Sequence, residues 1–283
     1  MPSVALLGVK GGPAIRPGSS MPTAQLLRLV GKAVLVDAGL GASRGVTGQG
    51  IGLHELDLIV VTHLHSDHYL ELGPLLHTAW TAGLKRPVRV IGPAGLKAYF
   101  ERFWASMAFD IELRIADEGR PDIRRMVELQ ELREGDVLNE DGLRLRAMRN
   151  LHPPIEDSFA LRFEGEGKAV VFSGDTAPMA EMVAFAKGAD LLVHEAMLLE
   201  GVDALCARVG NGDDRLKAHL LRSHTPAGEA GRIAAQAGVG ALALNHLIPN
   251  DDPDFTEGHW QAEVAPHWSG PLHLGRDGMV VEF

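Results

Sequence analysis

The sequence predicts an α/β (α+β) fold, because apolar stretches of strand length recur along the chain between stretches with helical periodicity. In the first part of the chain the predicted strands are 3–9, 25–30, 32–37 and 57–61. Residues 70–83 then place leucine and alanine at helical spacing, and 227–237 form a capped helix. Several strands run directly into histidine or aspartate, so chemically active side chains are expected at strand ends.

The individual elements follow from turn residues as well as from spacing. The second and third strands form a hairpin around Gly31, and strands 158–163 and 168–172 pair through a turn at 165–167. The other predicted elements are strand 88–91, helix 94–108, strand 143–148, helix 181–187, strand 190–193, strand 241–244 and strand 279–283. The charged residues after helix 94–108 have no clear period, so it stays open whether 94–134 forms a lid or a substrate arm.

Composition narrows the classes of function. The 283 residues carry a formal net charge of −10 and are 46% apolar, which is typical of a protein with a full core. The basic excess or basic stripe that nucleic-acid binders usually show is missing, so a nucleic-acid partner is not expected. No internal repeat or low-complexity segment divides the chain, which favours one domain over residues 1–283.

Cysteine usage and hydropathy indicate the cellular location. Cys206 is the only cysteine, so the chain has no internal disulfide and no thiolate cage, and a cytoplasmic location is expected. No apolar run approaches the ~20 residues of a membrane span, so no membrane association is expected. The acidic run 249–254 is interpreted as a solvated loop.

The segment Asp57–His68 carries the strongest chemical signal. A short apolar run of strand length ends in four side chains that can bind metal, namely His63, His65, Asp67 and His68. At strand-like spacing His63 and His65 project to one side and can reach one cation. Asp67 and His68 follow where the chain turns and can face a second cation. Imidazole with carboxylate suits zinc, or iron or manganese.

Other strands end in similar side chains. Strand 143–148 leads to His152 in a proline-rich turn, and strand 168–172 leads to Asp175 in a Gly-Asp turn with little bulk around the carboxylate. Asp37 also follows a strand, but we interpret it as a buried structural carboxylate that binds loop amides.

The segment His63–His68 resembles the HxHxDH signature of the metallo-β-lactamase superfamily, and the later motifs extend this resemblance over nearly the whole chain. The resemblance implies a four-layer αββα sandwich with two mixed sheets face to face, helices outside and a two-metal site at one edge. The implied ligands are His63, His65 and His152 for the first metal, Asp67, His68 and His246 for the second, and Asp175 between them. Two Zn²⁺ ions are therefore expected, with Mn²⁺ or Fe²⁺ as alternatives.

Two further segments resemble motifs of ribonuclease Z and its phosphodiesterase relatives. The first is 194–196, although Met197 follows where the family has threonine, and the second is 224–226. In that subfamily the histidine of the second motif donates a proton and the glutamate of the first orients it. The resemblance thus makes His224 the proton donor and Glu195 its partner. The residues alone also allow His224 to cap a helix and Glu195 to pair with a distant arginine.

The expected function is that of a binuclear metal-dependent hydrolase, which uses a metal-bridging hydroxide to cleave a small phosphodiester or ester. Asp67, Glu195 and His224 are its expected catalytic residues. Asp175 argues against antibiotic hydrolysis as the main activity, because the resemblance implies other residues there in true zinc β-lactamases. The acidic charge favours a small-molecule substrate, and no Gly/Pro-rich arm of the kind that grips tRNA is evident.

Three alternatives stay open. A ribonuclease-Z-like endonuclease acting on tRNA 3′ ends is favoured by Glu195 and His224 and opposed by the charge balance. Hydrolysis of a lactone, a sulfate ester or, weakly, a β-lactam could use the same centre. A redox member of the fold that binds iron and oxygen would need a flavin partner, and nothing in the sequence resembles one. A homodimer is usual for the nearest resemblances and is expected here.

Overall fold

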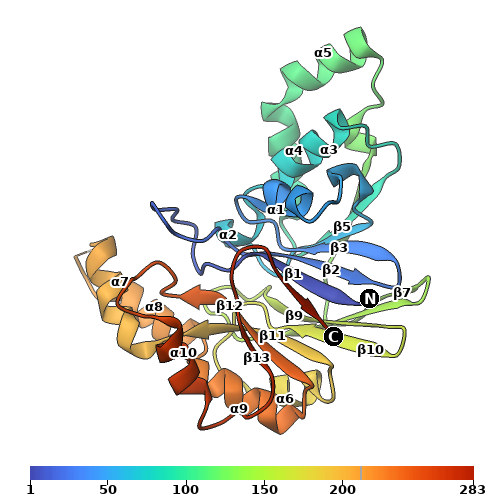
Figure 1. Ribbon diagram of the computed structural model, residues 1–283. Helices are drawn as coiled ribbons and strands as arrows, with labels where there is room; N and C mark the ends of the chain where they lie inside the picture. Colours follow the sequence, from blue (N-terminus) through green and yellow to red (C-terminus); the bar gives the residue numbers. More distant parts are fainter. Residues whose placement is uncertain (211) are drawn as a thin grey trace.

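Two mixed sheets of seven strands each lie face to face in the described part of the chain, with helices on both outer surfaces (Figure 1). The computed structural model describes residues 1–210 and 212–283. The arrangement is the four-layer αββα sandwich that the sequence analysis expects.

The strands divide between the sheets in chain order, except for the last one. The first sheet contains β1 (Ser3–Gly8), β2 (Ala24–Leu29), β3 (Lys32–Val36), β4 (Leu58–Val60), β5 (Val88–Gly92), β6 (Val127–Glu131) and β14 (Met279–Glu282). The second contains β7 (Gly135–Glu140), β8 (Leu143–Arg149), β9 (Phe159–Gly165), β10 (Lys168–Phe172), β11 (Leu191–Met197), β12 (Ala241–Ile248) and β13 (Leu272–Leu274). The strand orders are β14-β1-β2-β3-β4-β5-β6 and β13-β12-β11-β10-β9-β8-β7.

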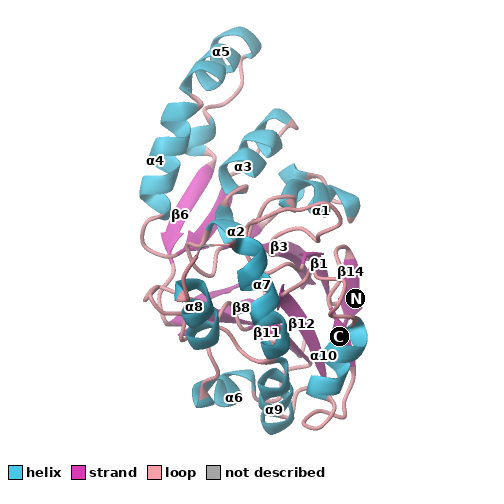
Figure 2. Cartoon of the chain, turned by 90° about the vertical axis from the view of Figure 1, so that its left-hand side faces the viewer, coloured by secondary structure: helices cyan, strands magenta, loops and turns pink. Residues whose placement is uncertain are grey.

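Each helix lies on the side of the sheet to which it is closest in sequence (Figures 1 and 2). Those on the side of the first sheet are α1 (Ala42–Gly48), α2 (Ser66–Tyr69), α3 (Leu72–Thr81), α4 (Leu96–Ser106) and α5 (Ala108–Glu118). Those on the side of the second are α6 (Ala180–Ala186), α7 (Val202–Val209), α8 (Arg215–Ser223), α9 (Ala227–Ala237) and α10 (Glu257–Val264). None of the helices in the described part of the chain combines the length and apolar character that crossing a lipid bilayer requires.

Both sheets have the same pairing pattern. In the first sheet, neighbouring strands from β14 through β1 and β2 to β3 pair antiparallel, and those from β3 to β6 pair parallel. In the second sheet, neighbouring strands from β7 to β10 pair antiparallel, and those from β10 to β13 pair parallel. The carboxyl ends of neighbouring parallel strands point to the same edge of a sheet, which is where ligands bind in open α/β sheets. The loops after β4, β10 and β12 therefore come together at one edge of the sandwich.

The main core lies between the sheets. Val34 and Val60 of the first sheet belong to the same buried cluster as Phe163 and Leu192 of the second. A second cluster lies on the outer face of the first sheet and includes Leu76 of α3. Each sheet is thus buried on both faces, which explains why strands such as β4 and β11 read as continuous apolar runs and not as alternating ones.

Several predicted elements differ from the observed ones. Strands β11 and β12 continue through Glu195 and His246 and end four residues beyond the predicted ends, because parallel neighbours on buried strands extend the ladder. The predicted solvated loop 249–254 is wrong for Asp251, whose side chain is only 3% exposed and forms ion pairs. Helices α7 and α8 are not predicted from the sequence, since the many polar residues of α8 obscure its apolar spacing.

Residues 94–134 form α4, α5 and β6, with the two helices projecting from the outer face of the first sheet (Figures 1 and 2). The tip exposes large apolar side chains, since Phe109 is 84% and Leu113 is 52% exposed. The tip lies away from the edge where the loops after the parallel strands meet (Figure 1).

We predict that Phe163→Ala lowers the free energy of unfolding of the metal-free protein by about 3–5 kcal/mol, because the ring is fully buried between the sheets and its loss leaves a cavity. Urea titrations followed by circular dichroism and by tryptophan fluorescence measure this value, and one domain predicts coincident transitions. The matched control is Phe109→Ala at an exposed position, with a change within about 0.5 kcal/mol. Two separate transitions would contradict the prediction of one domain.

Candidate metal centre

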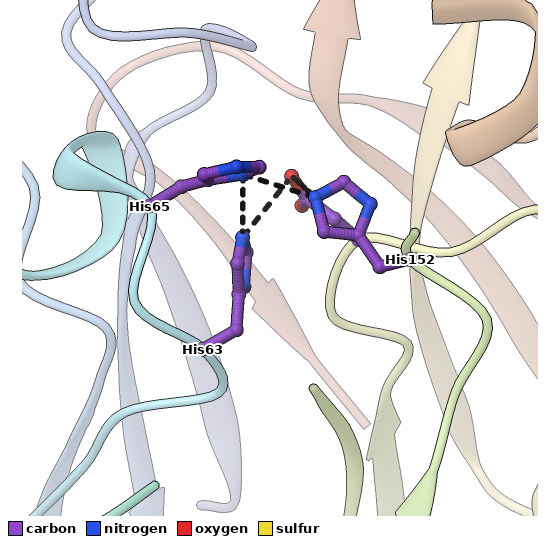
Figure 3. A group of neighbouring side chains, drawn as sticks. His63, His65 and His152 are labelled. Atoms are coloured by element: carbon purple, nitrogen blue, oxygen red, sulfur yellow. Dashed lines mark hydrogen bonds and ion pairs between the residues drawn. The ribbon is translucent and has the colours of Figure 1, made fainter. Parts of the chain in front are cut away.

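The seven predicted ligands lie together between the ends of strands from both sheets. Their donor atoms form two groups within which all atoms are no more than 4.8 Å apart. The first group consists of His63, His65, His152 and Asp175, and the second of Asp67, His68, Asp175 and His246. Figure 3 shows His63 and His65 extending from one loop and His152 from another, with their rings converging on a common point. Asp175 belongs to both groups, which is the bridging position that the resemblance implies.

The spacing of the first group fits a single ion. His65 Nδ1 lies 3.2 Å from His63 Nε2 and 3.0 Å from His152 Nε2. Asp175 Oδ2 lies 3.7 Å from His63 Nε2 and 3.9 Å from His152 Nε2. Ligand atoms around a tetrahedral zinc, each about 2.0–2.1 Å from the ion, lie roughly 3.3 Å apart. The three imidazoles and the carboxylate are therefore close to the separations that one zinc ion requires.

The second group has the same spacing. His246 Nε2 lies 3.0 Å from Asp175 Oδ2 and 3.3 Å from Asp67 Oδ2. His68 Nε2 lies 3.3 Å from Asp175 Oδ2 and is a buried nitrogen without a hydrogen-bond partner in the described part of the chain. Buried polar atoms are normally satisfied, so this nitrogen has the surroundings of a metal ligand.

Neighbouring groups orient the ligand rings. His68 Nδ1 donates to Asp37 at 2.7 Å, and the same carboxylate accepts a hydrogen bond from the Thr62 amide at 2.8 Å. Thr62 Oγ1 lies 3.1 Å from His63 Nδ1, and a backbone carbonyl lies 3.0 Å from His152 Nδ1. Hydrogen bonds to the far nitrogen fix the tautomer and orientation of a metal-binding imidazole. Asp37 is thus the buried structural carboxylate that the sequence predicts, and it also orients the ring of His68, a predicted ligand.

The loop after β1 packs against the second group. The Gly12 amide donates to Asp67 Oδ2 at 2.9 Å. A Cβ atom at Gly11 would lie 3.0 Å from the His246 ring, so the close approach of this loop requires glycine. His246 itself has a left-handed backbone with φ of 44°, a conformation that costs energy in residues other than glycine and is often found at functional sites.

Burial and carboxylates set the ionisation of the imidazoles. Burial keeps the pKa of His63 well below its usual range and lowers the pKa of His152 to about 4, so both rings are neutral, as metal binding requires. Burial also lowers the pKa values of His68 and His246, but the negative charges of Asp175 and the other nearby carboxylates outweigh this effect. The pKa of His246 rises to about 10, and that of His68 lies well above its usual range. The same negative potential would hold a divalent cation in place of these protons.

Glu195 and His224 form a buried pair beside the second group. His224 Nδ1 lies 3.1 and 3.2 Å from the two carboxylate oxygens of Glu195, which also accepts a hydrogen bond from the Thr176 amide at 2.7 Å. Burial, opposed by the His224 charge, raises the pKa of Glu195. The His224 ring stacks on His246 with centroids 5.4 Å apart. Glu195 therefore pairs with His224 and not with a distant arginine, while the catalytic roles of the two residues stay predictions.

One histidine beside the centre is not predicted from the sequence, and the histidine that precedes Glu195 in its motif belongs to neither group. The His219 ring lies 6.0 Å from that of His65 and 5.8 Å from that of His224. Leu216 and Leu220, four residues apart, are the signal that could have revealed its helix, α8. His194, in the same motif as Glu195, bonds the adjacent backbone carbonyl and is separate from both groups.

A cavity of about 380 Å³ adjoins the centre. Its walls are the loop 10–16, apolar side chains of α7 and α8, and the metal-centre residues His65, Asp67, Asp175 and His246. His219 and His224 also face it. Within the described part of the chain, residues 94–134 contribute nothing to these walls, so the projecting helices do not form a lid over this cavity.

Known proteins are similar to this chain in sequence and in fold. Residues 32–247 match the family model described as the β-lactamase superfamily domain. A protein named ribonuclease Z from Mycobacterium bovis (strain BCG / Pasteur 1173P2) is 32% identical over 285 residues, covering 100% of this chain and 98% of that protein.

Two solved structures show the same fold. The metallo-β-lactamase fold protein YhfI from Bacillus subtilis has a TM-score of 0.72 at 20% identity, with 99% of each chain covered. The short form of human tRNase Z has a TM-score of 0.68 at 21% identity, covering 99% of this chain and 98% of that one. The chain therefore belongs to the metallo-β-lactamase superfamily, on the branch that includes proteins named ribonuclease Z, and is a metal-dependent hydrolase.

Proposed function

We propose that this hydrolase is a phosphodiesterase that cleaves RNA in the manner of a ribonuclease Z. The observation that carries the proposal is the buried Glu195–His224 pair beside the two donor groups, in a chain whose relatives are named ribonuclease Z. The sequence alone favours a small phosphodiester or ester as substrate. The relatives favour its alternative, and they weaken the argument from net charge against a nucleic-acid partner.

Two divalent ions, most readily zinc, are proposed for the seven clustered donors, with Asp175 shared between them. When bound, such ions act as Lewis acids that activate water and neutralise negative charge on the phosphoryl group. Asp67 Oδ2, held by the Gly12 amide, is positioned to accept a hydrogen bond from the attacking water. The loop after β1 would thereby set the direction of attack.

His224 is proposed to protonate the leaving oxygen. Its Nδ1 is held by Glu195, so Nε2 is the nitrogen that remains free to exchange a proton with the substrate. The carboxylate of Glu195 fixes the ring in one orientation, as a buried acid does for the histidine of a catalytic triad. Because His224 faces the cavity, the leaving group would lie there.

A small phosphodiester is the second candidate, favoured by the net charge of −10 and by the limited volume of the cavity, about 380 Å³. The projecting helices α4 and α5 do not supply the basic surface that RNA would prefer, since residues 94–134 carry more acidic than basic side chains. A cytoplasmic location and a homodimer stay predictions.

The substrate test compares a precursor tRNA carrying a 3′ trailer with bis(p-nitrophenyl) phosphate, a lactone, an aryl sulfate and a β-lactam. We expect the zinc-loaded protein to cut the RNA at one position, with binding that weakens steeply as salt is raised. Hydrolysis of the small diester without any RNA cleavage would support the second candidate and contradict the first.

Asp175→Asn tests the shared ligand. We expect the wild-type protein to bind two equivalents of zinc and the variant to bind one or none, because one carboxylate oxygen belongs to both groups. Elemental analysis after dialysis measures the zinc content of each protein. The control, Asp117→Asn, makes the same chemical change at an exposed position and should keep both ions. Two retained equivalents in Asp175→Asn would refute the bridging role.

His224→Ala should lower kcat for RNA by about 10²- to 10⁴-fold, the usual contribution of a general acid, with zinc content unchanged. The loss should be much smaller for bis(p-nitrophenyl) phosphate, because p-nitrophenolate leaves without a proton whereas a ribose oxygen needs one. Steady-state kinetics on both substrates measure the difference, and His54→Ala, at an exposed site, is the control. An equal loss on both substrates would remove His224 as the proton donor.

A further inference from the structure

Lys10 is a buried cation on the wall of the cavity beside the metal centre. Its side chain is only 3% exposed, although lysine is almost never fully buried unless it is paired. Its backbone is fixed at the end of β1, where the Lys10 amide donates to the Met21 carbonyl at 3.0 Å and Lys10 bridges to Leu247, next to the ligand His246. The position of the lysine is therefore coupled to that of the centre.

The pairing of Lys10 is incomplete. Asp251 Oδ2 lies 3.7 Å from Lys10 Nζ, longer than a hydrogen bond, and the same oxygen accepts a 2.9 Å hydrogen bond from Arg16. Arg208 lies 3.4 Å from the other oxygen of Asp251 and 3.3 Å from Asp252. In this cluster three cations share two carboxylates, so one positive charge is left over. Burial, opposed by Asp251 and reinforced by Arg16, lowers the pKa of Lys10, and a bound anion would counter that effect.

The cavity also has an apolar wall. Leu205 and Val209 of α7 and Leu216 and Leu220 of α8 contribute to it, together with Ile248 at the end of β12. These branched side chains can cover the face of a planar ring. The volume of about 380 Å³ lies within the range of small-molecule sites, roughly 300–1,000 Å³. One cavity is thus lined by residues of the metal centre, by a buried lysine and by an apolar surface.

We propose that this cavity binds the nucleoside next to the scissile bond, with its base against the α7–α8 wall and its second phosphate on Lys10. The ammonium group supplies up to three hydrogen-bond donors to that phosphate. The inference rests on the proposed phosphodiesterase function for the bond that is cut. It adds that Lys10 determines specificity, so that substrates with an anionic group on either side of a nucleoside are preferred.

Binding of product analogues tests the proposal without turnover. Isothermal titration calorimetry of the zinc-loaded protein compares uridine 3′,5′-bisphosphate with uridine 3′-monophosphate and uridine 5′-monophosphate. We expect the bisphosphate to bind at least about tenfold more tightly than either monophosphate, the usual contribution of a charged hydrogen bond. Lys10→Met, which keeps the unbranched stem, should reduce this preference to about twofold or less, and Lys10→Arg should restore most of it.

Arg208→Met is the matched control, because it removes another cation from Asp251 but does not line the cavity. It should keep the preference. Leu216→Gln, at a half-buried position, tests the apolar wall separately. It should weaken binding of the bisphosphate roughly fivefold or more and leave the affinity for inorganic pyrophosphate unchanged. This variant also tests the subsite if Lys10→Met does not fold.

Two results would overturn the subsite. One is the absence of a preference for the bisphosphate over the monophosphates in the wild-type protein. The other is an equal loss of this preference in Lys10→Met and Arg208→Met. A bisphosphate preference in a protein that hydrolyses no phosphodiester would uphold the subsite and refute the proposed function. Phosphodiester hydrolysis without that preference would uphold the proposed function and refute the subsite.

Discussion

Three buried carboxylates packed against five imidazoles are the constraint on which the rest of the structure depends. Asp37, Asp67 and Asp175 are at most 5% exposed, and burying like charges together is costly unless cations or hydrogen bonds offset them. Each carboxylate therefore contacts an imidazole or an amide donor. The negative potential that remains is what makes the edge of the sandwich suited to divalent metal.

The architecture brings these groups together by repeating one pattern of strand pairing in two sheets. The parallel half of each sheet ends at the same edge, so loops distant in sequence meet across the gap between the sheets. Asp37 and His246 have left-handed backbones, with φ of 59° and 44°. These conformations cost energy in residues other than glycine, and here they place side chains of the site. The core between the sheets provides the rigidity that holds such conformations in place.

The sequence predicts those parts of the site that are local in the chain. His63 to His68 lie within six residues of a strand end, so their spacing alone indicates a metal site. The bounds of most strands and of α9 follow from periodicity and glycine turns in the same way. Assigning the remaining ligands depends on a family resemblance, because single histidines and aspartates after a strand have no distinctive spacing.

What the sequence does not predict depends on tertiary contacts. Lys10 and Asp251 are ordinary surface residue types 241 positions apart, and only the fold buries them as a pair. His219 belongs to a helix whose polar residues mask two leucines. Net charge does not show where the charges lie in the fold. An overall value of −10 is compatible with a local excess of positive charge beside the centre.

The wide separation of the ligands in the chain also bears on how the protein matures. The first donor is His63 and the last is His246, and each sheet supplies part of both groups. The first group is incomplete until ribosomal synthesis has passed Asp175, and the second group is incomplete until synthesis has passed β12 and the two sheets have docked. We therefore expect complete metal loading to be a late step of biogenesis, so that the cellular supply of divalent metal governs the active fraction of a pool that is already folded.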